Sequence, residues 1–334
     1  MTQKFLVSLI PVFLYLIMLL YLDSMKLVRK KLLMMCLGWG IISAGLCYFI
    51  NTYLIGIFHI EFESYSMLFA PVVEEILKFS FLWVLIRRSK IGFMIDGAIY
   101  GFSIGAAFSF VENLYYLFAY SSDENNLMVW IIRGFGTAIM HGGATGIMGI
   151  LCMSALNRKS NLTVSTLYGA LAAIFIHGIY NRFLVSPLLS TLLMVIITPA
   201  AIIFIFNLNE KSIRNWLELE FDSEVNMLRM IKKGKFSDTK TGGYLISIKE
   251  HFQPEIVVDI YCYLTLYLEL SMKAKSVLMM NEVGLSIPKD PALTDQLNEL
   301  EALKKNIGRG GCMAISPVLK MSRKDLWKLS ILRS

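Results

Sequence analysis

The stretch SMLFAPVVEEILKFSFLWVLI, from Ser66 to Ile86, is long and apolar enough to cross a bilayer, yet it contains two adjacent glutamates. Glu74 and Glu75 stand near its middle, and Lys78 follows one helical turn later. A charged side chain in hydrocarbon costs at least ~2.5 kcal/mol on insertion scales. We therefore expect these residues to have a function and to face other polar groups rather than lipid.

The composition of the whole chain is that of a polytopic membrane protein. Of its 334 residues, 56% are hydrophobic and only 17% are charged. The five cysteines form no CxxC pair, so no disulfide or zinc-finger spacing is visible. The net charge of +7 is gathered between apolar runs, which membrane topology explains without nucleic acid. We expect the lipid bilayer as environment and no nucleic-acid partner.

Seven apolar runs are long enough to span a membrane at about 1.5 Å of helix per residue. The pattern therefore predicts an all-α membrane helix bundle of about seven spans. The runs are Phe5–Leu22, Leu32–Phe58, Ser66–Ile86, Phe93–Ala119, Leu127–Leu156, Leu162–Leu184 and Ser186–Phe206.

The loops between these runs alternate in charge, which predicts the orientation of the chain. Basic loops lie preferentially in the cytoplasm. We therefore expect a multi-pass protein of the cell membrane with its N-terminus outside and its C-terminus in the cytoplasm. The basic loops hold Lys26, Arg29, Lys30 and Lys31, then Arg87, Arg88 and Lys90, then Arg158 and Lys159, and the acidic loops hold Glu61 and Glu63, then Asp123 and Glu124.

The composition changes after Phe206. Residues 208–334 contain 19 Lys and Arg and 16 Asp and Glu, and helical periodicity is visible over Ser212–Lys233, Pro254–Asn281 and Pro291–Asn306. We predict two domains, a membrane domain over residues 1–207 and a cytoplasmic helical domain over residues 208–334. The sequence does not indicate a partner for the second domain.

Four of the expected spans carry ionisable residues at overlapping depths. From the helix rise, Glu74, Glu112, His141 and His177 lie roughly 10–20 Å from the outer face. Asn181 is one turn from His177 and shares its face. This coincidence of depth predicts one shared, partly hydrated cavity in the outer half of the bilayer.

Glycines are concentrated on two of these spans. Small residues allow helix backbones to approach closely, so we expect the glycines to draw the two helices together. They are Gly97, Gly101 and Gly105 on the fourth span, and Gly142, Gly143, Gly146 and Gly149 on the fifth.

Each polar residue also has a simpler interpretation. A single intramembrane histidine such as His141 or His177 is often a hydrogen-bonded core residue. Lys78 is expected to neutralise one of the two glutamates, and Arg133 to extend outward to the headgroups. These interpretations do not account for three glutamates and two histidines at similar depth.

The motifs resemble those of the PrsW family of intramembrane proteases. They are APVVEEILK (70–78), FSFVEN (108–113), His141 followed by glycines, and HGIYN (177–181). The set is also similar to the EExxxR, FxxxH and HxxxN pattern of the CAAX prenyl endopeptidases. Lys78 in place of an arginine and Glu112 in place of a histidine fit the PrsW branch better and argue against a prenyl-protein substrate.

The resemblance implies peptide-bond hydrolysis within or near the membrane. Members of the family are implicated in regulated proteolysis of a membrane-anchored anti-sigma factor in stress signalling. We therefore expect a single-span membrane protein as substrate. Phe108 and Asn113, with Lys78, are expected to support the reacting groups.

Amide hydrolysis needs an activated water, a stabilised oxyanion and a proton for the leaving amine. A carboxylate in a cavity of low dielectric constant suits the first task. We expect either Glu74 or Glu75 to activate water, with the other carboxylate held by Lys78. His177 and Asn181 are expected to donate hydrogen bonds to the oxyanion.

The involvement of a metal is left open by the sequence. Glutamate and histidine ligands suit zinc, although no HExxH motif is present. Either a divalent metal is held by Glu75, Glu112, His141 and His177, or Glu112 and His141 orient the water in a metal-independent glutamate protease. Of the two, we favour the metal-independent chemistry.

Two other function classes fit the same residues. A proton-coupled transporter would use the Glu/His cluster as a relay, and would carry broken helices in paired positions of two halves. Pro71 interrupts only one span, and no matching half-repeat is visible. A catalytically silent binding protein, with the C-terminal domain as effector, is the third class.

Overall fold

The computed structural model describes residues 2–23, 26–120, 126–157, 161–283, 285, 290–319, 327, 329 and 332. The chain divides into two compact units, Met1–Asn209 and Glu210–Ser334. Throughout the described residues the regular structure is helical, as predicted. The loop charges expected at Asp123, Glu124, Arg158 and Lys159 lie outside the described residues.

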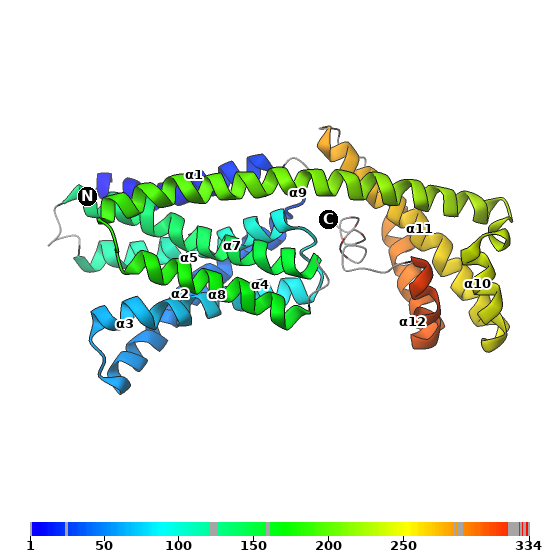
Figure 1. Ribbon diagram of the computed structural model, residues 1–334, viewed down its shortest axis with the longest axis horizontal. Coiled ribbons are helices and arrows are strands. Elements are labelled where there is room, and N and C mark those ends of the chain that lie inside the picture. The colour runs from blue at the N-terminus through cyan, green and yellow to red at the C-terminus, as the bar shows by residue number, and fades with distance from the viewer. Residues whose placement is uncertain are drawn as a thin grey trace. The chain divides into compact units, whose positions relative to one another are not determined.

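The first unit is a helix bundle in which α2, α4, α5, α7 and α8 lie side by side (Figure 1). Its central helix, α5, is buried along most of its length and packs against α1, α2, α4 and α7. The elements are α1 (Thr2–Leu22), α2 (Lys30–Phe58), α3 (Phe62–Leu68), α4 (Ala70–Arg87), α5 (Met94–Tyr120), α6 (Leu127–Ile131), the π-helix η1 (Ile132–Thr137), α7 (Ala138–Asn157), α8 (Leu162–Asn181) and α9 (Pro187–Lys232).

Among the described residues, six helices rather than seven are long and apolar enough to cross a membrane. The run expected as the third span is divided at Phe69 into α3 and α4, because Pro71 begins a new helix there. The 18 residues of α4 include Glu74, Glu75, Lys78 and Arg87, so by composition alone α4 does not qualify as a span. It packs against α2, α5, α7 and α8.

The last span also differs from its expected bounds. A turn separates α8 from α9, as expected, but α9 continues beyond Phe206 to Lys232. No glycine or proline stands between Phe206 and Lys232, so nothing in that stretch ends the helix. Gly234, with a φ of +67°, follows its end. The boundary between the two compact units falls within this helix.

The predicted close approach of the glycine-bearing helices is present between α5 and α7. A Cβ atom at Gly105 would lie 2.2 Å from the carbonyl oxygen of His141, and one at Gly101 would lie 2.4 Å from that of Thr145. Both neighbours are backbone atoms, which cannot turn aside as a side chain can. The contact therefore fixes the height of His141 against α5.

We expect Gly105→Ala to destabilise the protein by about 1–3 kcal/mol or more, because the added methyl group forces α5 and α7 apart. Thermal unfolding of the purified protein in detergent measures this change. Gly38→Ala is the matched control, since a Cβ atom at Gly38 has nothing within 4 Å. Equal stability of the two variants would contradict the packing role.

The second unit contains the end of α9 and the predicted amphipathic helices. Its elements after α9 are η2 (Phe236–Asp238), α10 (Lys240–Ile248), η3 (Lys249–His251), α11 (Pro254–Glu282) and α12 (Ala292–Leu319). Ile260 and Leu264 on α11, within the run predicted as helical, are buried in the core of this unit. Asp290 accepts a hydrogen bond from the Ala292 backbone N–H at 3.0 Å and caps α12, as its place before Pro291 suggests.

Candidate active site

Glu75 and Lys78 lie on the buried face of α4. Both side chains are completely enclosed, and the Lys78 ammonium donates a hydrogen bond to Glu75 Oε1. The same ammonium lies 3.0 Å from His141 Nδ1 on α7 and 4.6 Å from the centroid of the Phe108 ring on α5. The expectation that Lys78 neutralises one of the two glutamates is therefore met at Glu75.

The remaining hydrogen-bonding capacity of Glu75 is taken by two other helices. His177 Nδ1 on α8 lies 2.8 Å from Glu75 Oε1, and Thr145 Oγ1 on α7 donates to Oε2 at 3.3 Å. A carboxylate that accepts from an ammonium, an imidazole and a hydroxyl is well compensated in the interior. Glu75 thus ties α4 to α7 and α8.

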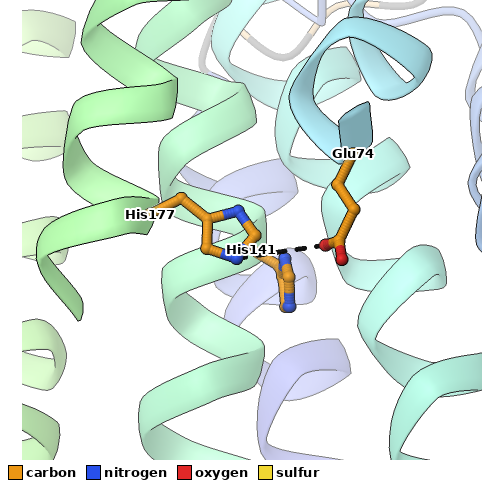
Figure 2. A group of neighbouring side chains, drawn as sticks. All are labelled: Glu74, His141 and His177. Atoms are coloured by element: carbon orange, nitrogen blue, oxygen red, sulfur yellow. Dashed lines mark ion pairs between the residues drawn. The ribbon is translucent and has the colours of Figure 1, made fainter. Parts of the chain in front are cut away.

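Glu74 points elsewhere, because neighbouring residues on an α-helix are rotated by about 100°. Its side chain is 14% exposed, and Oε2 lies 3.9 Å from His177 Nε2. Oε1 accepts a hydrogen bond from Asn51 Nδ2 at 3.5 Å. Figure 2 shows Glu74, His141 and His177 extending toward one another from three helices.

His141 connects this group to the third glutamate. Its Nε2 lies 2.9 Å from Glu112 Oε2, and Glu112 Oε1 lies 3.2 Å from a guanidinium nitrogen of Arg133. An ammonium has only donors, so His141 Nδ1 accepts from Lys78 and the ring proton is on Nε2, where it is donated to Glu112. The rings of His141 and His177 meet edge to face, with centroids 4.7 Å apart.

Glu74, Glu112, His141 and His177 line a cavity of about 730 Å³. The cavity is bounded by α2, α3, α4, α5, η1, α7 and α8. Glu75 and Lys78 are not among its lining residues, so the two adjacent glutamates have different environments. The carboxylate, guanidinium, imidazole and amide side chains that line it are Glu74, Glu112, Arg133, His141, His177, Asn51 and Asn181.

Glu74, His141 and His177 form a group that could hold a metal ion. Each offers one ligand atom, and the three atoms lie within 4.8 Å of one another. The sequence placed Glu75 and Glu112 beside the two histidines in a ligand set, whereas the structure brings Glu74 to them. Glu75 instead contacts His177 at Nδ1, and Glu112 contacts His141 at Nε2.

The family of the chain follows from a comparison with known families. The model of the PrsW family intramembrane metalloproteases matches residues 29–206, more than half of the chain. The chain belongs to the PrsW family. It is therefore an intramembrane protease and a multi-pass membrane protein. A search of curated proteins and a search of solved structures each found no match.

Membership in the PrsW family narrows the function classes considered above. It favours proteolysis over the proton-coupled transporter and over a silent binding protein. The family description also names a metal, which favours a divalent ion over the metal-independent chemistry. The group of Glu74, His141 and His177 is consistent with that description, without indicating which metal is bound.

The two asparagines of the PrsW motifs, Asn113 and Asn181, differ in whether they line the cavity. Asn181 lines the cavity, and its Nδ2 donates to the Ser66 carbonyl oxygen at 3.0 Å, which ties the end of α8 to α3. Asn113 is buried away from the cavity and donates to the Ser8 carbonyl oxygen at 3.0 Å. Phe108 contacts the cluster through the His141 ring, with centroids 5.1 Å apart.

The structure adds residues to the site that the sequence did not indicate. Arg133, in the π-helix η1, was expected to extend outward, but its guanidinium pairs with Glu112. Thr145 stands one turn beyond His141, so its spacing could have placed it on the same face. Asn51, which accepts from the Tyr65 hydroxyl at 2.9 Å, belongs to a helix without any recognised motif.

Proposed function

We propose that Glu74, His141 and His177 hold the catalytic divalent metal ion of this PrsW protease. The observation that carries this proposal is the meeting of their three ligand atoms on the wall of one cavity. Two histidines and one glutamate are a donor set found in catalytic zinc sites, where three protein ligands leave a position open. Because His141 uses both ring nitrogens in hydrogen bonds, a bound metal replaces one of them.

A divalent ion at these ligands supplies Lewis acidity for hydrolysis of a peptide bond. The protein supplies the orientation of its ligands. Glu75 accepts from His177 Nδ1 and so directs Nε2 of that ring toward Glu74. A carboxylate behind a ligating histidine fixes the tautomer and the ring orientation. Lys78 and Thr145 hold Glu75 in that position.

Proton transfer and oxyanion stabilisation fall to the other residues that line the cavity. Glu112 is the second glutamate on the wall, with a side chain that is 28% exposed, and it is within hydrogen-bonding distance of His141. We assign proton transfer to Glu112 because Glu75 does not reach the cavity. Asn181 uses one N–H for the Ser66 carbonyl, and its amide has a second N–H for the oxyanion.

Removal of the metal is expected to abolish cleavage. Purified protein treated with a strong chelator should stop cutting a single-span reporter, and stoichiometric Zn²⁺ should restore the rate. Mg²⁺ should not restore it, because that ion prefers six oxygen ligands. Gel analysis of the reporter fragments measures the rates. An unchanged rate after complete chelation would support the metal-independent glutamate protease instead.

The proposed substrate is a single-span membrane protein cut near the outer half of the bilayer. The basic loops support an orientation with the N-terminus outside and the C-terminus in the cytoplasm. This orientation needs seven crossings, so in our proposal α4 crosses the bilayer too, packed against α2, α5, α7 and α8, and the cavity lies in the outer half. An anti-sigma factor of a stress response is the substrate that the family resemblance suggests. Proteomics of membrane-protein fragments, comparing cells with the wild type and with Glu74→Gln, tests this. Fragments that are equally abundant in both cells would overturn the substrate assignment.

A further inference from the structure

The first helix lies outside the stretch that matches the PrsW family, which begins at residue 29. It is nevertheless part of the packed bundle, because α1 contacts α5, α6, η1 and α7. Ser8, Val12 and Leu19 on α1 are completely buried. A helix that served only as a membrane anchor would not need to make these contacts.

A chain of polar contacts runs from the α1 backbone to the candidate metal ligand His141. Asn113 Nδ2 donates to the Ser8 carbonyl oxygen at 3.0 Å and to the Arg133 carbonyl oxygen at 3.3 Å. Asn113 Oδ1 accepts from Arg133 Nε at 3.1 Å. The Arg133 guanidinium then pairs with Glu112 at 3.2 Å, and Glu112 contacts His141 Nε2 at 2.9 Å.

Arg133 lies in the π-helix η1. Single-turn π segments are rare and occur often at functional sites. Gly134 follows Arg133 within η1, and a Cβ atom there would lie 1.9 Å from the Val7 carbonyl oxygen. The backbones of α1 and η1 are therefore in direct contact, and only glycine permits this distance. The guanidinium also lies 3.7 Å from the centroid of the Tyr116 ring, which supports it from the side.

We propose that Arg133 and Asn113 are positioning residues that use α1 as their anchor to hold Glu112 against His141. In this arrangement α1 is a functional part of the protease. Ordinary helix packing would explain the contact at Gly134. It would not explain why the Asn113 amide holds the Arg133 guanidinium, which in turn pairs with Glu112. The inference deepens the proposed function and depends on it for the role of His141.

The first test reads the state of the His141 ring in the complete, metal-free protein. NMR of [15N]histidine-labelled protein in detergent at fixed pH distinguishes the two ring tautomers, and the His141→Gln variant assigns the signal. The wild type should show the single tautomer with its proton on Nε2, as the Lys78 and Glu112 contacts require. Arg133→Met and Gly134→Ala should both give a mixture of tautomers.

The second test separates positioning from substrate binding. Arg133→Met and Gly134→Ala should lower kcat for the reporter about 10–100-fold and leave KM within about twofold, as expected for partners behind a metal ligand. Arg133→Lys, which keeps the charge but cannot contact Asn113 and Glu112 together, should recover part of the loss. The affinity of the metal-free variants for Zn²⁺ should fall with kcat.

Two control variants match these changes away from the chain of contacts. Arg87→Met removes another arginine that lies over an aromatic ring, that of Trp83 at 5.1 Å, and Gly38→Ala adds a methyl group with nothing within 4 Å. Both should behave as the wild type. If folded Arg133→Met and Gly134→Ala keep the wild-type tautomer and kcat, the positioning role is wrong. The NMR measurement uses metal-free protein, so it tests the positioning role of Arg133 and Asn113 even if cleavage needs no metal. Failure of the metal proposal and failure of the positioning proposal can therefore be distinguished.

Discussion

Glu74→Gln is expected to lower the cleavage rate of a single-span reporter about 100-fold or more, because losing a metal ligand should cost at least as much as losing a partner behind one. Glu74 supplies the carboxylate of the group that includes His141 and His177, and it faces the cavity. Glutamine keeps the shape of the side chain and can still accept from Asn51, but it lacks the negative charge. Fold and stability should therefore change little.

Gel analysis of reporter fragments over time measures this loss, with size-exclusion chromatography and thermal unfolding as checks on the fold. Glu63→Gln, on an exposed residue in the first turn of α3, is the matched control and should cut at the wild-type rate. A folded Glu74→Gln protein that cuts as fast as the wild type would exclude Glu74 from the reaction.

Lys78→Met is expected to cause the largest loss of stability, about 3–5 kcal/mol. Methionine fills a similar volume but leaves the Glu75 carboxylate enclosed without its cation. Removing one partner of a buried ion pair costs more than removing both, because the remaining charge has lost its compensation. The double variant Lys78→Met/Glu75→Gln should therefore regain much of the stability lost in the single variant.

Thermal unfolding in detergent, combined with the fraction of monodisperse protein after purification, measures these differences. Lys31→Met changes an exposed lysine at the start of α2 and should leave the unfolding temperature unchanged. The outcome that contradicts the ion-pair argument is a double variant no more stable than Lys78→Met. Glu75 would then need its charge for contacts other than the one with Lys78.

The sequence predicted the grouping of the site because depth along a helix follows from residue number. Glu74, Glu112, His141 and His177 were expected at similar depth, and the structure places all four on one cavity. Which of the two adjacent glutamates faces that cavity could not be predicted in the same way. The rotation of α4 about its axis is set by α2, α5, α7 and α8, which contact it from several sides.

The direction of Arg133 was predicted wrongly for a related reason. A regular α-helix from Leu127 to Leu156 was assumed, whereas six residues of that run form the π-helix η1. Hydrophobic periodicity does not reveal a change of helix type over one turn. The continuation of α9 beyond Phe206 could have been predicted, because no glycine or proline follows before Lys232. The polar composition after Phe206 indicates where contact with lipid ends, but it does not indicate where the helix ends.

The division of tasks between Glu74 and Glu75 has a consequence for proteins of similar sequence. Glu75 and Lys78 hold three helices together without touching the cavity, and Glu74 faces the cavity without holding the fold. A related chain that keeps the second glutamate and the lysine but has lost the first would still assemble its bundle while being unable to cut. We therefore expect a single substitution at the first glutamate to separate assembly of the bundle from cleavage.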